Sequence, residues 1–215
     1  MAILKRCVAG GFSTLKCHKR AYFIINLAYY GLVAMAMMYV ADHPDLQLAL
    51  LDGVASSLAQ GPLLGVAEAY AGGHILQAIC LTFLFNFFLG SVAMLILPSL
   101  ILPFAGVGIG LIRAVLWGLL LAPTTPELQA AMMPHSLTLI VEGQGYILSM
   151  LAAWAMGRAF TSPTSVGAAS WTGGYGRGLK QLLRLLPLVA IVLAMAAIYE
   201  VLEVIYLVPL LLPQG

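Results

Sequence analysis

Five side chains that can bind ions or do acid–base and hydrogen-bonding chemistry stand inside otherwise apolar stretches: Asn86, Arg113, Glu142, Glu200 and Glu203. A charge at the centre of a bilayer costs at least about 2.5–3.5 kcal/mol, so in a membrane these groups must meet one another or line a wet cavity. Glu200 and Glu203 lie three residues apart, which puts both carboxyl groups on one face of a helix. Paired carboxyl groups can share a proton or bind a cation.

His135, Glu142 and Ser149 recur at intervals of seven residues, with Thr138 close by. At 3.6 residues per turn these side chains share one face of a helix, and we expect that face to point into a helical bundle. A histidine and a glutamate together also suggest metal-dependent hydrolysis. The sequence lacks the second histidine of a zinc motif such as H-E-x-x-H, so we predict no metal and no other cofactor.

The elements that position these residues follow from composition. The chain is 62% hydrophobic and 8% charged, whereas soluble proteins carry about 25% charged residues. A helix needs roughly 20 apolar residues to cross the hydrocarbon layer, and periodic strand alternation is absent. We therefore predict an all-α polytopic membrane protein with five transmembrane helices in one bundle, after a tail of residues 1–21. The predicted spans are residues 22–40, 75–97, 104–122, 137–160 and 185–212.

The five polar residues inside the predicted spans lie at similar depths in the membrane. Measured from the outer helix ends at about 1.5 Å per residue, their positions fall roughly 10–18 Å below the outer face. We predict one buried cluster of Asn86, Arg113, His135, Glu142, Glu200 and Glu203. Two interpretations stay open: a buried Arg–Glu pair that holds the bundle in register, or a proton or cation relay.

The basic residues are segregated from the acidic ones. Lys5, Arg6, Lys16, Lys19 and Arg20 precede the first span, and Arg158, Arg177, Lys180 and Arg184 lie at the connection between the fourth and fifth. The other side receives Asp42, Asp45, Asp52, Glu68 and Glu127. The positive-inside rule then predicts a cell-membrane protein with a cytoplasmic N-terminus and an external C-terminus. The basic tail is a topology signal or, alternatively, a helix on the membrane surface.

Three connecting segments carry further expectations. Residues 42–73 predict two short amphipathic helices outside the membrane, the first with Asp42 as N-cap and Pro44 in its first turn. Pro98 and Pro103 bracket the turn of a hairpin between the second and third spans. Residues 161–178 are rich in Gly, Ser and Thr and predict a flexible loop, because "GGYGRG" lacks the Lys-Ser/Thr and the strand of a phosphate loop.

Small residues recur every four positions in two spans. The third carries Gly106, Gly110, Ala114, Gly118 and Ala122, and the fourth carries Gly145, Ser149, Ala153 and Gly157. In lipid, such stripes let helix backbones approach closely. We predict that the third and fourth spans pack on each other, with a homodimer contact as the alternative.

Four motifs, "FLFNFFLG", "GIGLIRAVLWG", "PHSLTLIVEGQG" and "EVLEVIYLVP", are similar to those of the stage II sporulation protein M family. The similarity covers roughly residues 75–210, with Ser136 in place of a glycine and Glu142 farther from His135 than in the family pattern. The resemblance implies a five-span membrane protein without established catalysis. Its sporulation member is associated with recruiting cell-wall-degrading partners.

We therefore expect a non-enzymatic membrane scaffold or subunit of a cell-envelope assembly. Its partners would be membrane lipid, other membrane or envelope proteins, or a second copy of the chain, and not nucleic acid. One alternative is a proton- or cation-coupled transporter or channel that uses Arg113, Glu142, Glu200 and Glu203. Another is an intramembrane hydrolase that uses His135 and Glu142.

Overall fold

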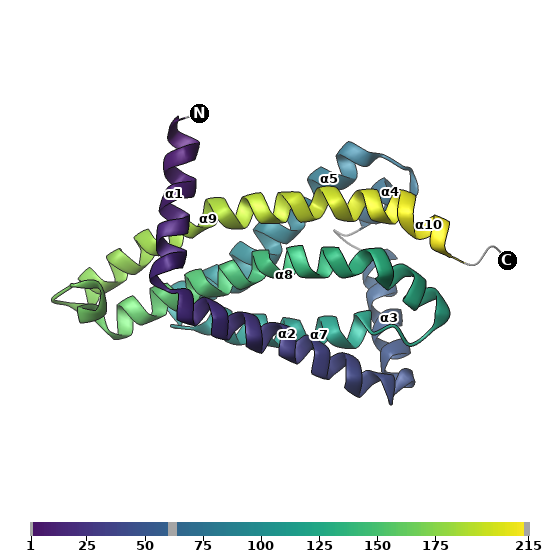
Figure 1. The fold of residues 1–215 in the computed structure, drawn as a ribbon, viewed down its shortest axis with the longest axis horizontal. Coiled ribbons are helices and arrows are strands. Elements are labelled where there is room, and N and C mark those ends of the chain that lie inside the picture. The colour runs from purple at the N-terminus through teal and green to yellow at the C-terminus, as the bar shows by residue number, and fades with distance from the viewer. Residues whose placement is uncertain (1, 60–63, 213–215) are drawn as a thin grey trace.

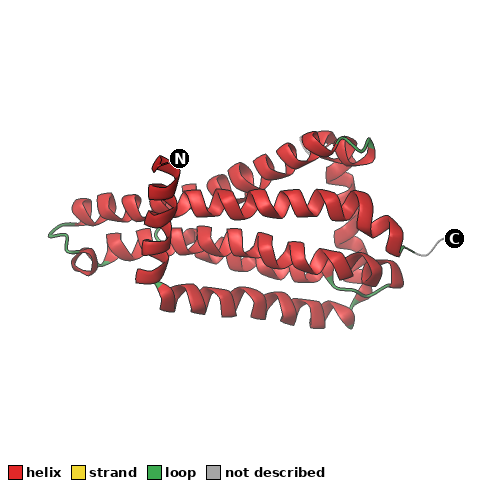
Figure 2. Cartoon of the chain, turned by 45° about the horizontal axis from the view of Figure 1, so that its top comes forward, coloured by secondary structure: helices red, strands yellow, loops and turns green. Residues whose placement is uncertain are grey.

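The structure is a computed structural model that describes residues 2–59 and 64–212. These residues form helices joined by short turns and contain no strand, so the prediction of an all-α fold is confirmed for them. Figure 2 shows the same helical composition over the described chain. In chain order the elements are α1 (Ala2–Cys17), α2 (Lys19–Ala41), α3 (Pro44–Ala59), α4 (Leu64–Ala71), α5 (Ile75–Leu84), η1 (Phe85–Ile96), α6 (Leu97–Ile101), α7 (Ala105–Leu121), α8 (Pro126–Thr161), η2 (Pro163–Val166), α9 (Trp171–Leu202), η3 (Glu203–Leu207) and α10 (Val208–Leu211).

Four helical segments are long and apolar enough to cross a membrane: Lys19–Ala41, Ile75–Ile101, Pro126–Thr161 and Trp171–Leu211. This agrees with the prediction of a polytopic membrane protein. The remaining predicted span, residues 104–122, forms α7, an apolar helix of 17 residues.

The long helices lie side by side along the long axis of the molecule, whereas α1 and α3 cross that axis near opposite ends (Figure 1). α8 is the central helix: half of its 36 residues are buried, and it packs along α9 and also contacts α2, α7 and η1. The other spanning segments leave most of their residues on the surface. The bundle therefore shields polar groups on α8, such as Thr138, Glu142 and Ser149, from its surroundings.

α8 begins earlier than predicted, at Pro126 rather than at residue 137. The Thr125 hydroxyl accepts a hydrogen bond from the Leu128 amide, Pro126 occupies the first position and Glu127 the first turn. These are the residues that start a helix best, so the apolar pattern placed the start too late.

The predicted flexible loop at residues 161–178 is also mostly helix, because α9 begins at Trp171. Ser170 caps its first turn by accepting from the Gly173 amide at 3.2 Å. A Cβ placed at Gly174 would lie 2.2 Å from the Ala159 carbonyl oxygen of α8. Gly174 and Gly178 of "GGYGRG" are therefore contact residues between α8 and α9, and glycine content was misleading as a sign of flexibility.

The segment after α2 does form short helices, α3 and α4, as predicted; Gly61 and Pro62 lie outside the described residues. Asp42, however, ends α2 and is not the cap of α3: its amide donates to the Tyr39 carbonyl, and the next amide, of His43, donates to the Val40 carbonyl. Buried Gln47 fixes α3 to the end of α7. Its amide donates to the carbonyls of Leu120 at 3.1 Å and Ala122 at 2.8 Å.

The predicted hairpin joins α6 to α7 through a turn at residues 102–104, where Phe104 adopts a positive φ of 67°. The Ser99 hydroxyl accepts a hydrogen bond from the Gly106 amide at 2.7 Å, which caps the start of α7. Two segments depart from regular α-helix: η1 and η3 form wider π-helical turns. Glu203 is the first residue of η3.

Candidate functional site

One face of α8 carries the polar residues at the centre of the bundle. His135, Thr138, Glu142 and Tyr146 fall on this face because they are separated by three or four residues each. Thr138, Glu142 and Tyr146 are buried, and His135 lies nearer the surface. Ser149 continues the face, but its hydroxyl donates to the Gly145 carbonyl of its own helix.

Arg113 of α7 meets this face in the first of two networks. Its Nη2 donates to the Tyr146 hydroxyl at 2.7 Å, and that hydroxyl donates to Glu142 Oε1 at 2.7 Å. Arg113 Nη2 and Glu142 Oε1 themselves lie 3.9 Å apart. The tyrosine therefore bridges the ion pair, and the three side chains fasten α7 to α8.

Aromatic rings enclose the Arg113 guanidinium. Its carbon lies 4.0 Å from the Tyr146 ring centroid and 5.2 Å from that of Trp117. Such contacts stabilise a cation most where water is excluded. Arg113 Nε is buried without a hydrogen-bond partner, as is the Tyr29 hydroxyl of α2.

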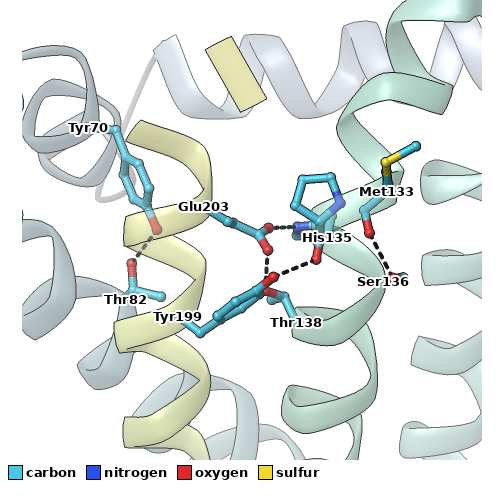
Figure 3. A network of polar contacts seen from close by, with 9 residues as sticks. Tyr70, Thr82, Met133, His135, Ser136, Thr138, Tyr199 and Glu203 are labelled. Carbon is cyan, nitrogen blue, oxygen red and sulfur yellow. Dashed lines mark hydrogen bonds and ion pairs between the residues drawn. The ribbon is translucent and has the colours of Figure 1, made fainter. Parts of the chain in front are cut away.

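The second network joins α8 to the last spanning segment (Figure 3). His135 Nδ1 hydrogen-bonds Glu203 Oε1, and the Thr138 hydroxyl donates to Glu203 Oε2 at 2.9 Å. Glu203 is fully buried, and each of its carboxylate oxygens has a hydrogen-bond partner, His135 or Thr138, in place of water. One turn away, the Tyr199 hydroxyl donates to the Pro134 carbonyl at 3.2 Å.

Glu200 lies beside this network with one oxygen, Oε2, buried and without a hydrogen-bond partner. Its neighbour Tyr70, on α4, forms a 3.0 Å hydrogen bond with the Thr82 hydroxyl (Figure 3). Burial, with the nearby Glu200 carboxyl adding to it, raises the pKa of Tyr70 well above its usual value. Tyr70 therefore stays neutral and available as a hydrogen-bonding group.

The predicted cluster is thus divided. The structure pairs Arg113 with Glu142 and His135 with Glu203, and it places Glu200 next to the second pair. Asn86, on η1, forms no side-chain hydrogen bond within the described part of the chain. The hydrolase interpretation needed His135 and Glu142 to act together, but the partner of His135 is Glu203.

Among residues 2–59 and 64–212, no three His, Cys, Asp or Glu side chains gather closely enough to hold a metal ion.

A further polar contact between α2 and α8 was not expected. Gln144 Nε2 donates to Asn26 Oδ1 at 2.7 Å and to the Tyr30 hydroxyl at 3.0 Å, and Gln144 Oε1 accepts from Tyr22. The Tyr30 hydroxyl in turn donates to the Ile140 carbonyl at 2.7 Å. Asn26 and Gln144 are amides inside apolar stretches, and that signal was present in the sequence.

The small-residue stripes pack on several partners rather than mainly on each other. A Cβ at Gly110 would lie 2.5 Å from Met150 of α8, but one at Gly118 would lie 2.4 Å from the Val33 carbonyl of α2. Similarly, Gly106 faces Leu95 of η1, Gly145 faces Leu193 of α9, and Gly157 faces Phe104. Ala114 and Ala153 are also buried. Each stripe winds with its helix and so meets different neighbours along its length.

No protein-family model, no curated protein and no solved structure matches the chain. The similarity to the stage II sporulation protein M family therefore rests on the quoted motifs alone and stays a hypothesis.

Proposed function

We propose that the protein is a non-enzymatic integral membrane scaffold or subunit of a cell-envelope assembly, built as a five-span bundle. One observation carries this proposal: the polar groups at depth are used to join helices. Arg113, Tyr146 and Glu142 connect α7 to α8, and His135, Thr138 and Glu203 connect α8 to the last segment.

Paired polar groups of this kind favour one packing over its competitors. Removing one partner of a buried pair leaves a desolvated group, so alternative arrangements of the helices are costly. A substrate site would instead need donors or acceptors left free for the substrate, and among the six side chains of these two networks Arg113 Nε alone is buried without a hydrogen-bond partner. A fixed bundle suits a protein whose task is to hold partners in place.

The five-span topology is supported by length and charge. α7 has 17 residues and would rise about 25 Å, close to the thickness of the hydrocarbon layer. Five crossings place the basic α1–α2 junction and the basic α8–α9 connection on one side. By the positive-inside rule that side is the cytoplasm.

Two surfaces suit partners in such an assembly. α1 carries Lys5, Arg6 and Lys16 and projects across α9 at the basic end (Figure 1). At the other end α3 exposes Leu48 and Val54. Both elements lie across the bundle axis, where they are accessible to proteins at the membrane surface.

A flux assay in liposomes tests the proposal against transport. Purified protein is reconstituted, and proton and monovalent-cation fluxes are followed with pH- and potential-sensitive dyes under imposed gradients. The scaffold proposal expects the same flux as in protein-free liposomes. A protein-dependent flux that Glu142→Gln abolishes, while Glu127→Gln on the exposed first turn of α8 does not, would contradict it.

A proton or cation pathway is the second candidate, and Glu200 favours it. Its Oε2 is buried and unpartnered beside the His135–Glu203 pair, and Glu203 begins a π-helical turn. Such turns are frequent at functional sites. In the same assay, flux abolished by Glu200→Gln but retained in Glu68→Gln on α4 would establish this function in place of the scaffold.

A further inference from the structure

A cavity of about 1100 Å³ lies at the basic end of the bundle, apart from both polar networks. It is bounded by the α1–α2 junction on one side and by the end of α8, the following turn and the start of α9 on the other. Figure 1 shows these segments together at the end where the chain turns between α8 and α9.

The cavity collects most of the positive charge of the chain. The α1–α2 junction contributes Lys16, Lys19 and Arg20.

The opposite wall contributes Arg158, Arg177, Lys180 and Arg184. Seven of the ten Lys and Arg residues therefore surround one cavity whose lining, all of it within the described residues, includes no Asp or Glu.

No ion pair within residues 2–59 and 64–212 neutralises this charge. The ion pairs of the described residues are Arg113–Glu142 and His135–Glu203, both in the bundle centre. Like charges around a cavity repel one another, and a bound anion removes that repulsion. The positive-inside rule explains why basic residues lie at this end, but Lys5 and Arg6 lie there too and do not line the cavity. The concave arrangement therefore needs its own explanation.

Aromatic and amide groups order the wall. The Arg158 guanidinium lies 5.5 Å from the Trp154 ring centroid, and the His18 ring meets the same tryptophan edge-on at 5.3 Å. His18 Nε2 is also hydrogen-bonded to Gln181 Oε1 at 2.8 Å. The Arg158 guanidinium donates no hydrogen bond within the described part of the chain, so its N–H groups are available to a phosphate, which guanidinium groups can bind through two oxygens at once.

Part of the remaining lining is apolar and belongs to two predicted spans. Ile24 and Ile25 of α2 and Val107 of α7 form it. Ile24 is 63% exposed, and Leu27, one turn farther along α2, is 67% exposed. A free phosphate would use the cations alone, whereas an amphiphile would use the cations and this apolar strip.

We propose that the cavity binds the phosphate group of an anionic phospholipid, whose acyl chain lies along Ile24 and Leu27. Lys19, Arg20, Arg158 and Arg184 would hold the phosphate at the membrane surface. The proposal does not depend on the scaffold function or on transport.

Native mass spectrometry of the detergent-solubilised full chain tests it with three probes. Dioleoylphosphatidylglycerol carries the anionic phosphate and two acyl chains. Dioleoylphosphatidylcholine has the same chains with a zwitterionic headgroup, and glycerol 3-phosphate has a phosphate without chains. We expect phosphatidylglycerol to bind about tenfold more tightly than phosphatidylcholine. We expect glycerol 3-phosphate to bind far more weakly than phosphatidylglycerol, because it has no acyl chains.

Two double variants remove equal charge from different places. Arg158→Gln with Arg184→Gln changes the cavity, and Lys5→Gln with Arg6→Gln changes the same end outside it. We expect about a tenfold loss of phosphatidylglycerol affinity in the first and less than about a twofold loss in the second. Arg184 also contacts α1, so if size-exclusion chromatography shows the first variant misfolded, Lys19→Gln with Lys180→Gln replaces it.

Three results would overturn the proposal. Equal binding of phosphatidylcholine would show that the cations select nothing. Equal losses in the two double variants would show diffuse surface attraction. Glycerol 3-phosphate bound as tightly as phosphatidylglycerol would assign the cavity to a soluble phosphate compound.

Discussion

Arg113 illustrates how one charged side chain is accommodated at the centre of an apolar bundle. A carboxylate, a bridging tyrosine hydroxyl and two aromatic rings surround its guanidinium. Each contact alone is modest, but together they replace the water that a cation loses on burial. If one of these groups is removed, the partner that remains is buried without its counter-charge, and the folded state is destabilised.

Removing one member of this pair should therefore destabilise the protein more than removing both. Arg113→Gln or Glu142→Gln alone is expected to cost about 3–5 kcal/mol, because the other charge stays buried and unpaired. The double variant should recover part of that loss. Reversible unfolding in mixed micelles measures the free energies, and strictly additive losses would show that the two residues do not interact.

The Gln144 amide of α8 hydrogen-bonds three side chains of α2, Tyr22, Asn26 and Tyr30, so its removal should destabilise the protein. Gln144→Leu leaves Asn26 and Tyr22 without their partner, and we expect a loss of about 1–3 kcal/mol. Gln77→Leu is the matched control, because Gln77 is exposed on α5. A Gln144 variant as stable as the Gln77 variant would argue against a structural role for this contact.

At the scale of helices, small residues decide how closely elements approach. α7 contacts α2 at Gly118, α8 at Gly110 and η1 at Gly106, each with no room for a Cβ atom. Gly108, on the same helix, has nothing within 4 Å of its Cβ position. Neighbouring helices therefore approach α7 closely on the side that carries Gly106, Gly110 and Gly118, and not on the side of Gly108.

Alanine at the two kinds of glycine should have opposite effects. Gly118→Ala would press on the Val33 carbonyl of α2 and is expected to lower the melting temperature in detergent. Gly108→Ala should be neutral or stabilising by up to about 1 kcal/mol, since alanine favours helix. If the Gly118→Ala variant had the same melting temperature as the Gly108→Ala variant, α2 and α7 would be able to move apart without loss of stability.

At the scale of the whole molecule, charge divides the bundle into two ends. The cationic cavity occupies one end, and α3 with Asp45 and Asp52 lies at the other. By the positive-inside rule we expect the basic end to face the cytoplasm. Partners at the two ends would accordingly meet surfaces of different charge.

Cysteine labelling checks that orientation with residues the chain already has. Cys7 and Cys17 are exposed at the basic end, and Cys80→Ser removes the third thiol. A membrane-impermeant maleimide should label Cys17 only after permeabilisation. Ser56→Cys on α3 should be labelled in intact cells. The reverse pattern would invert the proposed topology.

Hydropathy and charge segregation were enough to predict that the chain is helical, that several helices are long and apolar enough to cross a membrane, and that one end is basic. These properties are local or additive, so each can be read from a short stretch of residues. The same reasoning placed Asn86, Arg113, Glu142, Glu200 and Glu203 within the predicted spans. It missed the early starts of α8 and α9 because caps and packed glycines can extend a helix beyond its apolar run.

Only the tertiary structure decided which residues meet. It paired His135 with Glu203, left Asn86 aside, and turned successive glycines of α7 towards different helices. Partner choice depends on the rotation and crossing of helices that are distant in sequence, and the free energy of those contacts is shared among all of them. Charges from four separate segments likewise surround one cavity only because α1, α2, α8 and α9 come together at the same end.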